Sequence, residues 1–389
     1  MTKLEEYLNP LLLKKNNFRK VSFASLKKVI SELEINIPSK IISVTGTNGK
    51  GSTLEILSRV LSNNNYRVGL FTSPHLIRFN ERIRINNKPV LDDEILQCLK
   101  KLEVLDEYKD FNFFQLFSLV CFMIFSKKQL DVWLLEVGLG GRYDPVNCFD
   151  ADISVITKVA LDHEDILGKG IENIGREKAG IIRKNNVTIF GEGKIPKSVD
   201  RVISKLKPSF YKVEDSNIQL KNFHKNSVAI AEKIIDLEFK PLNATLELNK
   251  LKNLSYFGRT HLFKENLLLD VSHNSDSINN LQNYLIQNFY DIPKRAIFSC
   301  NKSKEIEELC EPIIDLFDEW FLPVLDSNRM KDNVIIKKYL KSKGKKIKLG
   351  YDINQIIKFL NKNEKNRLNV AFGSFILIGK IYESYNLKI

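Results

Sequence analysis

The sequence lacks paired cysteines, internal repeats and any long hydrophobic run. Its five cysteines, at positions 98, 121, 148, 300 and 310, form no Cys-x-x-Cys pair. An odd number of unpaired cysteines is typical of reduced thiols in a cytoplasm. The N-terminus is polar, without the apolar core of a signal peptide. The most apolar stretch, Phe113–Phe125, is too short to span a bilayer and contains Gln115. We therefore expect a cytoplasmic protein with no membrane partner.

Length and charge further limit the classes to which the protein can belong. A chain of 389 residues with 43% hydrophobic content exceeds what one core usually holds, so two domains are expected. The formal net charge of +13 could indicate a nucleic-acid partner. The basic residues are spread along the chain among many Asn and Ile, however, so we interpret the charge as compositional background that can also steer anionic substrates. No nucleic-acid partner is predicted.

The most informative stretch is 41–53, a β-branched run followed by Gly46-Thr-Asn-Gly-Lys-Gly-Ser-Thr. Glycines at 46 and 49 allow positive φ and a close backbone approach. Lys50 adds a positive charge, and we expect Ser52 and Thr53 to cap the following helix. A strand, a glycine turn with lysine and a helix N-terminus together make a phosphate-binding loop. The spacing differs from the usual G-x-x-x-x-G-K-[ST], and an ordinary glycine-rich turn is the alternative.

Polar residues also follow other predicted strands. The strand 67–71 is followed by Thr72-Ser-Pro-His, and the apolar strand 131–137 carries Glu136 at its end, with Arg142 just beyond. Ligands bind at the carboxyl ends of strands in open α/β sheets, and an acidic residue there often holds a nucleotide-bound Mg²⁺. A solvated loop and a satisfied strand-end carboxylate are the alternatives. His163 and Lys178 follow; taken alone, the first reads as structural and the second as a surface lysine.

The alternation of strands and helices predicts an α/β fold in two domains. We expect residues 1–253 to form a P-loop-type domain around a doubly wound parallel sheet, and residues 254–389 to form a smaller Rossmann-like α/β domain. The boundary is placed where the rhythm breaks, around 240–258.

An ordered series of motifs resembles the folylpolyglutamate synthase / dihydrofolate synthase branch of the Mur ligase superfamily, over roughly residues 41–379. The motifs are Gly46-Thr-Asn-Gly-Lys-Gly-Ser, Thr72-Ser-Pro-His-Leu with Asn80-Glu-Arg-Ile, Glu136-Val-Gly-Leu-Gly-Gly-Arg, Asp162-His, Glu177-Lys-Ala-Gly-Ile, Gly258-Arg, Asp270-Val-Ser-His-Asn and Gly373-Ser-Phe. Any one of them is moderately specific, but eight in register are strong evidence.

The resemblance implies a role for each matching residue. ATP would be bound by Gly46, Asn48, Gly49, Lys50, Gly51, Ser52, Asn226, Arg259, Asp270 and His273. Two Mg²⁺ ions would be held by Ser73 and Glu136 at the first site and by His163 at the second, with Lys178 matching the family's carbamylated lysine. Lys50, His163, Lys178 and Arg142 would act in catalysis. Phe114, Gln115, Tyr143 and Asp144 align with the pteroate pocket.

Departures from the family pattern fall mainly on the pterin side. The family usually has Glu where Gln115 stands, Leu-Asp-Ala-Thr-Asn where 143–147 read Tyr-Asp-Pro-Val-Asn, and Pro before Gly258-Arg259. Its Asp-x-Ala-His-Asn-Pro reads Asp-Val-Ser-His-Asn-Ser at 270–275. The ATP machinery is thus intact, whereas the acid substrate is left open.

The implied reaction is ATP-dependent joining of L-glutamate to dihydropteroate or to a folate glutamate chain, through an acyl phosphate, by a monomer. A peptidoglycan-type ligase is a second interpretation; it would need a UDP-sugar site ahead of the phosphate loop, where only 40 residues stand. A non-catalytic nucleotide switch that binds nucleic acid is a third.

Overall fold

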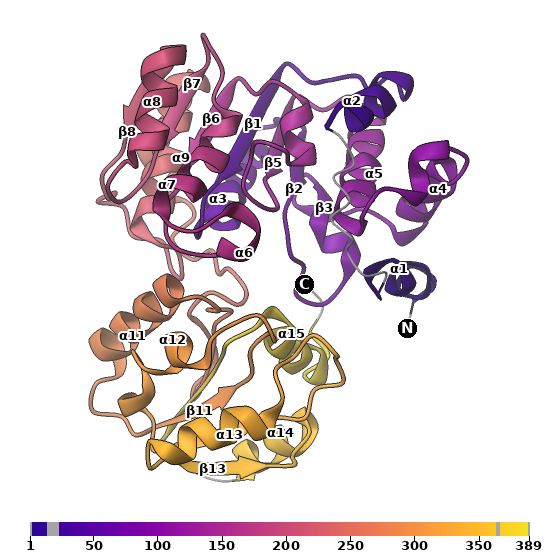
Figure 1. Cartoon of the computed structure of the whole chain (residues 1–389). Coiled ribbons are helices and arrows are strands. Elements are labelled where there is room, and N and C mark those ends of the chain that lie inside the picture. The colour runs from indigo at the N-terminus through magenta and orange to yellow at the C-terminus, as the bar shows by residue number, and fades with distance from the viewer. Residues whose placement is uncertain (1, 14–22, 363–365, 388–389) are drawn as a thin grey trace. The chain divides into compact units, whose positions relative to one another are not determined.

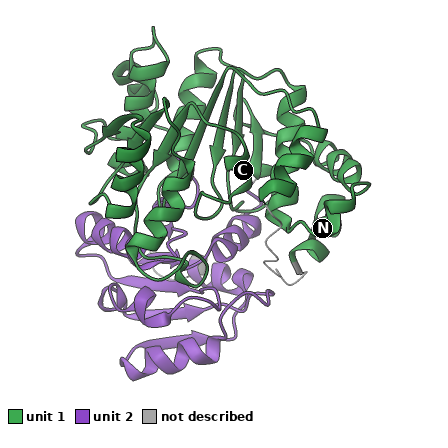
Figure 2. Cartoon of the chain, turned by 45° about the horizontal axis from the view of Figure 1, so that its top comes forward, with its two compact units in different colours: residues 1–254 green, residues 255–389 purple. Residues whose placement is uncertain are grey.

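The computed structural model describes residues 2–13, 23–362 and 366–387. The chain divides into two compact units, residues 1–254 and 255–389, shown in separate colours in Figure 2. The predicted division was 1–253 and 254–389. Each unit is built on its own sheet with helices around it (Figure 1), so the predicted α/β class with two sheets is confirmed.

Unit 1 contains an eight-stranded sheet in the order β4-β3-β2-β5-β1-β6-β7-β8. Its strands are β1 Lys40–Thr45, β2 Val68–Phe71, β3 Ile83–Ile85, β4 Lys88–Pro89, β5 Val132–Glu136, β6 Ile153–Ile156, β7 Val187–Phe190 and β8 Ser209–Lys212. All pairs from β2 to β8 are parallel, whereas β3 and β4 form an antiparallel edge that the sequence analysis did not predict. The apolar central strands are buried on both faces, as parallel strands require.

The helices of unit 1 lie mainly in the connections between strands. They are α1 Lys3–Leu13, α2 Phe23–Glu32, α3 Lys50–Asn63, α4 Asp92–Leu102, α5 Phe113–Lys127, α6 Glu164–Leu167, α7 Ile171–Lys178, α8 Lys197–Leu206, α9 Lys225–Glu238 and α10 Ala244–Asn249, with short 3₁₀ helices at Phe79–Arg82, Asp106–Lys109, Pro145–Cys148 and Ala179–Ile181. The sequence pattern predicts helices over 92–108 and 172–184, but the first ends at Leu102 and the second at Lys178.

The apolar stretch 113–125 predicts a buried helix, and α5 is indeed buried in a core cluster of unit 1. Its Phe122 and Phe125 rings pack against Trp133 of β5 at centroid distances of 6.2 and 5.6 Å. Burying an aromatic side chain of this size stabilises the fold by a few kcal/mol. The cluster therefore fixes β5, the strand that carries Glu136, from one side of the sheet.

Unit 2 is built on a six-stranded sheet in the order β13-β12-β11-β14-β10-β9, of which only the β10–β9 pair is antiparallel. Its strands are β9 His261–Lys264, β10 Leu267–Leu269, β11 Lys294–Phe298, β12 Glu319–Leu322, β13 Lys346–Leu349 and β14 Leu368–Phe372. Its helices are α11 Ser275–Phe289, α12 Ile306–Cys310, α13 Asn333–Ser342, α14 Ile353–Lys362 and α15 Phe375–Ser384, with a 3₁₀ helix at Ile314–Leu316. The sequence pattern predicts a hairpin of 262–263 with 267–271 around 264–266, and the antiparallel pair β9–β10 confirms it.

Candidate active site

The glycine loop 46–49 joins β1 directly to the N-terminus of α3. Gly49 is the N-cap, with φ 85°, and no side chain caps the helix. The expected capping by Ser52 and Thr53 is therefore wrong: the helix begins earlier, at Lys50, and the Thr53 hydroxyl donates back to the Gly49 carbonyl at 3.0 Å. Gly49 has no side chain that could accept from the first amides of α3, and a helix N-terminus of this kind is suited to phosphate.

A residue that the sequence analysis did not single out, Thr157, braces this loop. Its hydroxyl donates to the Asn48 carbonyl at 2.6 Å, and a Cβ at Gly46 would lie 1.8 Å from the same hydroxyl oxygen. Gly46, with φ 151°, therefore has to be glycine so that the loop can lie against the end of β6. Thr47 adds a second anchor, because its amide donates to the Lys158 carbonyl at 2.9 Å and its hydroxyl to that of Ala160 at 3.1 Å.

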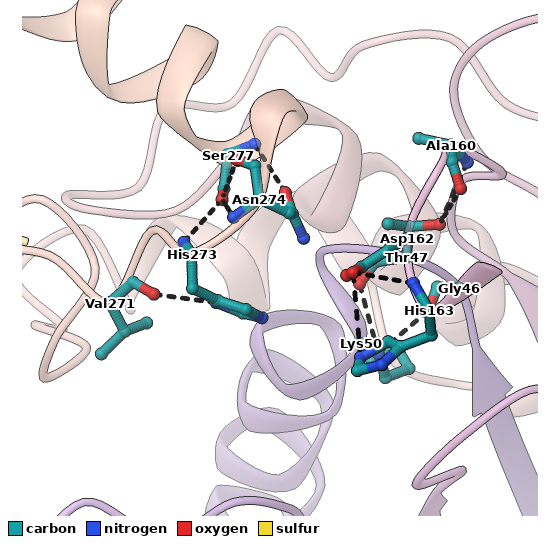
Figure 3. A network of polar contacts seen from close by, with 10 residues as sticks. All are labelled: Gly46, Thr47, Lys50, Ala160, Asp162, His163, Val271, His273, Asn274 and Ser277. Atoms are coloured by element: carbon teal, nitrogen blue, oxygen red, sulfur yellow. Dashed lines mark hydrogen bonds and ion pairs between the residues drawn. The ribbon is translucent and has the colours of Figure 1, made fainter. Parts of the chain in front are cut away.

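The ammonium of Lys50 lies within this loop. It donates to the carbonyls of Gly46 at 2.9 Å and Thr47 at 3.3 Å, as Figure 3 shows. Gly51 and Ser52 continue the first turn of α3 and are buried. The loop therefore places one fixed cation beside the helix N-terminus, the arrangement that offsets phosphate charge.

Glu136 and Ser73 meet at the neighbouring strand ends. Glu136 closes β5 opposite Val44 of β1, is 4% exposed, and accepts a hydrogen bond from the Ser73 amide at 3.0 Å. A serine and a buried carboxylate supply the oxygen ligands that Mg²⁺ prefers. Among the described residues there is no group of three or more His, Cys, Asp or Glu side chains suited to a metal, so Mg²⁺ here would need phosphate or water oxygens as well, as is usual for this ion.

Lys178, at the last turn of α7, is buried and not a surface lysine. Burial, together with the positive charge of Lys50, lowers the pKa of Lys178 to about 7, while Asp162 opposes that shift. The α7 segment also packs on the loop after β5: the Arg142 amide donates to the Glu177 carbonyl at 2.9 Å, and a Cβ on Gly180 would lie 2.5 Å from Arg142 Cα. Lys178 is therefore an amine that is partly neutral near pH 7, held close to the phosphate loop.

His163 follows β6 with a left-handed backbone, φ 54°, at the start of α6. Its amide donates to the Asp162 carboxylate at 3.0 Å, and its Nε2 lies 3.9 Å from the same oxygen (Figure 3). The imidazole is 42% exposed. Asp162 orients this histidine and also acts electrostatically on Lys178, so the three residues form one group around the loop after β6.

Asp144 and Arg142 belong to the loop after β5. Asp144 is 5% exposed, and its oxygens accept hydrogen bonds from the amides of Gly138 at 3.0 Å, Leu139 at 3.1 Å and Val146 at 3.0 Å. Burial raises the pKa of Asp144 to about 7, although these amides and the charge of Lys50 lower it. Asp144 therefore shapes the glycine-rich loop, whereas Tyr143 is 60% exposed beside the Arg142 guanidinium.

Phe114 and Gln115 lie in the first turn of α5. The Phe114 ring packs so tightly on Gly138 that a Cβ there would lie 2.4 Å from it. Gln115 has a clear structural role: its side chain accepts the Asn112 amide at 3.0 Å, and its own amide donates to the Asn112 side chain at 3.0 Å. This capping box was readable in the sequence as Asn112-x-x-Gln115.

Asn226, in the first turn of α9, has a buried side-chain amide group, and its Nδ2 finds no hydrogen-bond partner among the described residues. A Cβ on Gly191 would lie 2.4 Å from Asn226 Oδ1, so that glycine allows the close approach. The next residue, Ser227, lies against Gly49: a Cβ there would be 3.3 Å from its hydroxyl. This buried donor beside the phosphate loop is therefore available to a ligand or a water.

Unit 2 brings Arg259, Asp270 and His273 together around the end of β10. Asp270 is buried and accepts the Thr260 amide at 2.6 Å and the Ser272 amide at 2.7 Å; burial raises the pKa of Asp270, and the Arg259 charge opposes this. His273 Nδ1 contacts the Val271 carbonyl at 2.9 Å, and its amide donates to the Ser277 hydroxyl at 3.1 Å (Figure 3). The Arg259 guanidinium stacks 5.2 Å from the Phe375 ring.

Comparison with known proteins identifies the class. Residues 44–248 match the model of the Mur ligase middle domain, which is more than half of the chain. The phosphate loop and the surrounding strand ends described above all lie within this match, so unit 1 contains a Mur ligase middle domain.

Full-length relatives narrow this to one family. The chain is 31% identical over 382 residues to a dihydrofolate synthase/folylpolyglutamate synthase of Buchnera aphidicola, covering 90% of each chain. It is 28% identical over 428 residues to the protein of the same name from Haemophilus influenzae, covering 97% of each. The chain belongs to the dihydrofolate synthase/folylpolyglutamate synthase family.

Solved structures agree with this assignment. The crystal structure of a bifunctional folylpolyglutamate synthase/dihydrofolate synthase from Yersinia pestis, complexed with AMPPNP and Mn ion, has a TM-score of 0.89 at 27% identity and covers 100% of this chain and 99% of that one. The predicted fold and family are confirmed. In the part of the chain that the structure describes, no helix is long and apolar enough to cross a membrane.

Proposed function

We propose that this protein is an ATP-dependent ligase that joins L-glutamate to dihydropteroate, to folate glutamate chains, or to both. The observation that carries the proposal is the phosphate loop itself: an uncapped α3 N-terminus and Lys50 lie beside strand ends that carry Glu136 and Ser73. The related Yersinia pestis enzyme has been crystallised with Mn, AMPPNP and L-glutamate bound. The same chemistry is expected here because the loop residues are those of the family motif.

The family resemblance assigns the phosphate-binding roles, and the geometry of the loop supports them. Residues 46–52 and the α3 amides would cradle the ATP phosphates, and Asn226 would use its unpaired amide group as a further nucleotide contact. In unit 2, we assign Arg259, Asp270 and His273 as nucleotide-binding residues. Glu136 with Ser73, and His163 with Lys178, would hold two Mg²⁺ ions, which offset phosphate charge and orient the transferring group when bound.

The reaction proceeds in two steps. A carboxylate oxygen of the acid attacks the γ-phosphorus of ATP, and ADP leaves, which produces an acyl phosphate. The amine of glutamate then attacks the acyl carbon; inorganic phosphate leaves and the amine gives up a proton. Lys50 would stabilise the charge that develops on the phosphoryl oxygens, and most of the catalysis is positioning and electrostatics.

The acid substrate is the open point. Phe114 packs against the loop after β5, close to Glu136, but Gln115 and Asp144 have their polar atoms engaged in capping α5 and shaping that loop. We therefore expect Phe114, the exposed Tyr143 and Arg142 to contact a pteroate. Gln115 and Asp144 should contribute fewer direct contacts to it. Dihydropteroate should be accepted, and chain extension is left to experiment.

The decisive experiment incubates the protein with ATP, glutamate and either dihydropteroate or tetrahydrofolate, followed by mass analysis of the products. We expect one glutamate added to dihydropteroate, with ADP released in equal amount. Extension of tetrahydrofolate alone would overturn the dihydropteroate assignment. ATP hydrolysis that is independent of both acid and glutamate would favour a nucleotide switch.

Five free thiols fit the proposed cytoplasmic location. Sedimentation would test the proposed monomer.

A further inference from the structure

Tyr382 lies at the centre of an aromatic cluster in unit 2 whose other rings are half-buried. The residue belongs to α15 and is 0% exposed. Phe257, His261 and Phe263 surround its ring at centroid distances of 5.6, 5.9 and 5.5 Å. A phenol this deeply buried needs partners for its hydroxyl, because a buried polar group without them costs about 1–3 kcal/mol.

The hydroxyl has two partners whose roles can be worked out. The Gly258 amide can only donate, and it lies 2.9 Å from Tyr382 Oη, which therefore accepts there. His261 Nδ1 lies 2.6 Å from the same oxygen. Because the oxygen accepts from Gly258, its own proton can be donated to Nδ1, and this arrangement corresponds to the His261 tautomer that carries its proton on Nε2.

This hydrogen-bond chain ends on the residue before Arg259. Gly258 has φ 70°, and its carbonyl accepts the Val271 amide at 2.9 Å, so both of its peptide groups are held. On the other side of Arg259, the Thr260 amide donates to Asp270 at 2.6 Å. The backbone of Arg259 is thus fixed from both sides, while its guanidinium stacks on Phe375, which begins the same helix that carries Tyr382.

We infer that Tyr382, oriented by His261, is a positioning residue that holds the Gly258-Arg259 turn in the conformation that binds nucleotide. The inference rests on the proposed nucleotide role of Arg259. It assigns a function to a buried tyrosine and a histidine that no sequence motif singled out. The positioning acts through the Gly258 amide, so it should affect ATP more than glutamate.

The test compares Tyr382→Phe with Tyr385→Phe. Tyr385 is matched because it packs on the same cluster, 5.1 Å from Phe263, and its hydroxyl makes no side-chain hydrogen bond within the described residues. Tyr382→Phe removes both hydrogen bonds of the hydroxyl and leaves the Gly258 amide without this partner, so it should raise the KM for ATP by about three- to tenfold, with the KM for glutamate unchanged. Hydrogen exchange of the peptide around Gly258 should be at least about tenfold faster. Tyr385→Phe should change neither quantity.

Histidine variants give an independent arm if Tyr382→Phe does not fold. His261→Leu removes the acceptor and should behave like Tyr382→Phe, whereas His261→Asn keeps a polar atom near the Nδ1 position and should restore part of the effect. Arg259→Ala distinguishes a failure of the proposed nucleotide role of Arg259 from a failure of the inference about Tyr382. If it leaves the KM for ATP unchanged, the nucleotide role of Arg259 is wrong and the inference falls with it. If it raises that KM while Tyr382→Phe and His261→Leu do not, only the inference is overturned.

Discussion

Lys178 provides the sharpest test of the chemistry. An ordinary lysine, with a pKa near 10.4, is neutral in only about one molecule in several thousand at pH 7. Burial and the Lys50 charge lower the pKa of Lys178 to about 7, so about half of the amines are neutral there. The neutral amine can add to CO₂ and release a proton, which gives a carbamate. The folded structure thus supplies about a thousandfold more reactive amine than solvent exposure would.

We expect Lys178→Ala to lose most ligase activity, measured as ADP release with both co-substrates present. Formate or acetate should restore part of it by supplying a carboxylate in the vacated space. Lys178→Arg cannot be carbamylated and should stay inactive. In the parent protein, ¹³CO₂ should give a carbamate carbon signal by NMR that both variants lack. Lys184→Arg, an exposed position nearby in sequence, is the control. An arginine variant that turns over like the parent would refute the carbamate role.

Three further predictions follow from the same sites. Lys50→Ala should slow turnover by two to three decades, about 3–4 kcal/mol, because charge develops on the phosphates in the transition state; near-normal ADP release would exclude the phosphate-loop assignment. Gln115→Ala should lower the free energy of unfolding in urea by about 1 kcal/mol through loss of the capping box, whereas Gln115→Glu should keep it; equal stability of the two variants would contradict this. Asn226→Ala should raise the KM for ATP without lowering the melting temperature, because its amide nitrogen has no partner in the described part of the protein; a large loss of stability would instead make it structural.

Acid–base behaviour adds a stability test of the Lys178 environment. Because the folded-state pKa is about 7 and the unfolded value is near 10.4, the unfolded chain binds more protons between these values. The contribution of Lys178 to the free energy of unfolding should therefore rise from pH 7 to pH 10, and Lys178→Met should remove this rise. Urea titrations across that range measure it.

The sequence by itself determined the phosphate loop, the order of strands and helices, and the family. The signals for them are local, because glycine spacing, β-branched runs and capping residues act within a few positions of each other. The Asn112-x-x-Gln115 capping box is a local signal of the same kind, and it could have been found in the sequence. Residues of the predicted ATP site, from Gly46 to Ser52, accordingly lie on one loop and one helix turn.

The tertiary structure decided what depends on segments far apart in the chain. Thr157, just beyond the end of β6, braces the glycine loop from more than a hundred positions away. Lys178 changes from a surface cation to a partly neutral amine only because it is buried and lies near the charge of Lys50. Tyr382 reaches Gly258 across an even longer separation. Desolvation and close packing depend on which segments fold together, and neither the spacing nor the identity of neighbouring residues in the sequence carries that information.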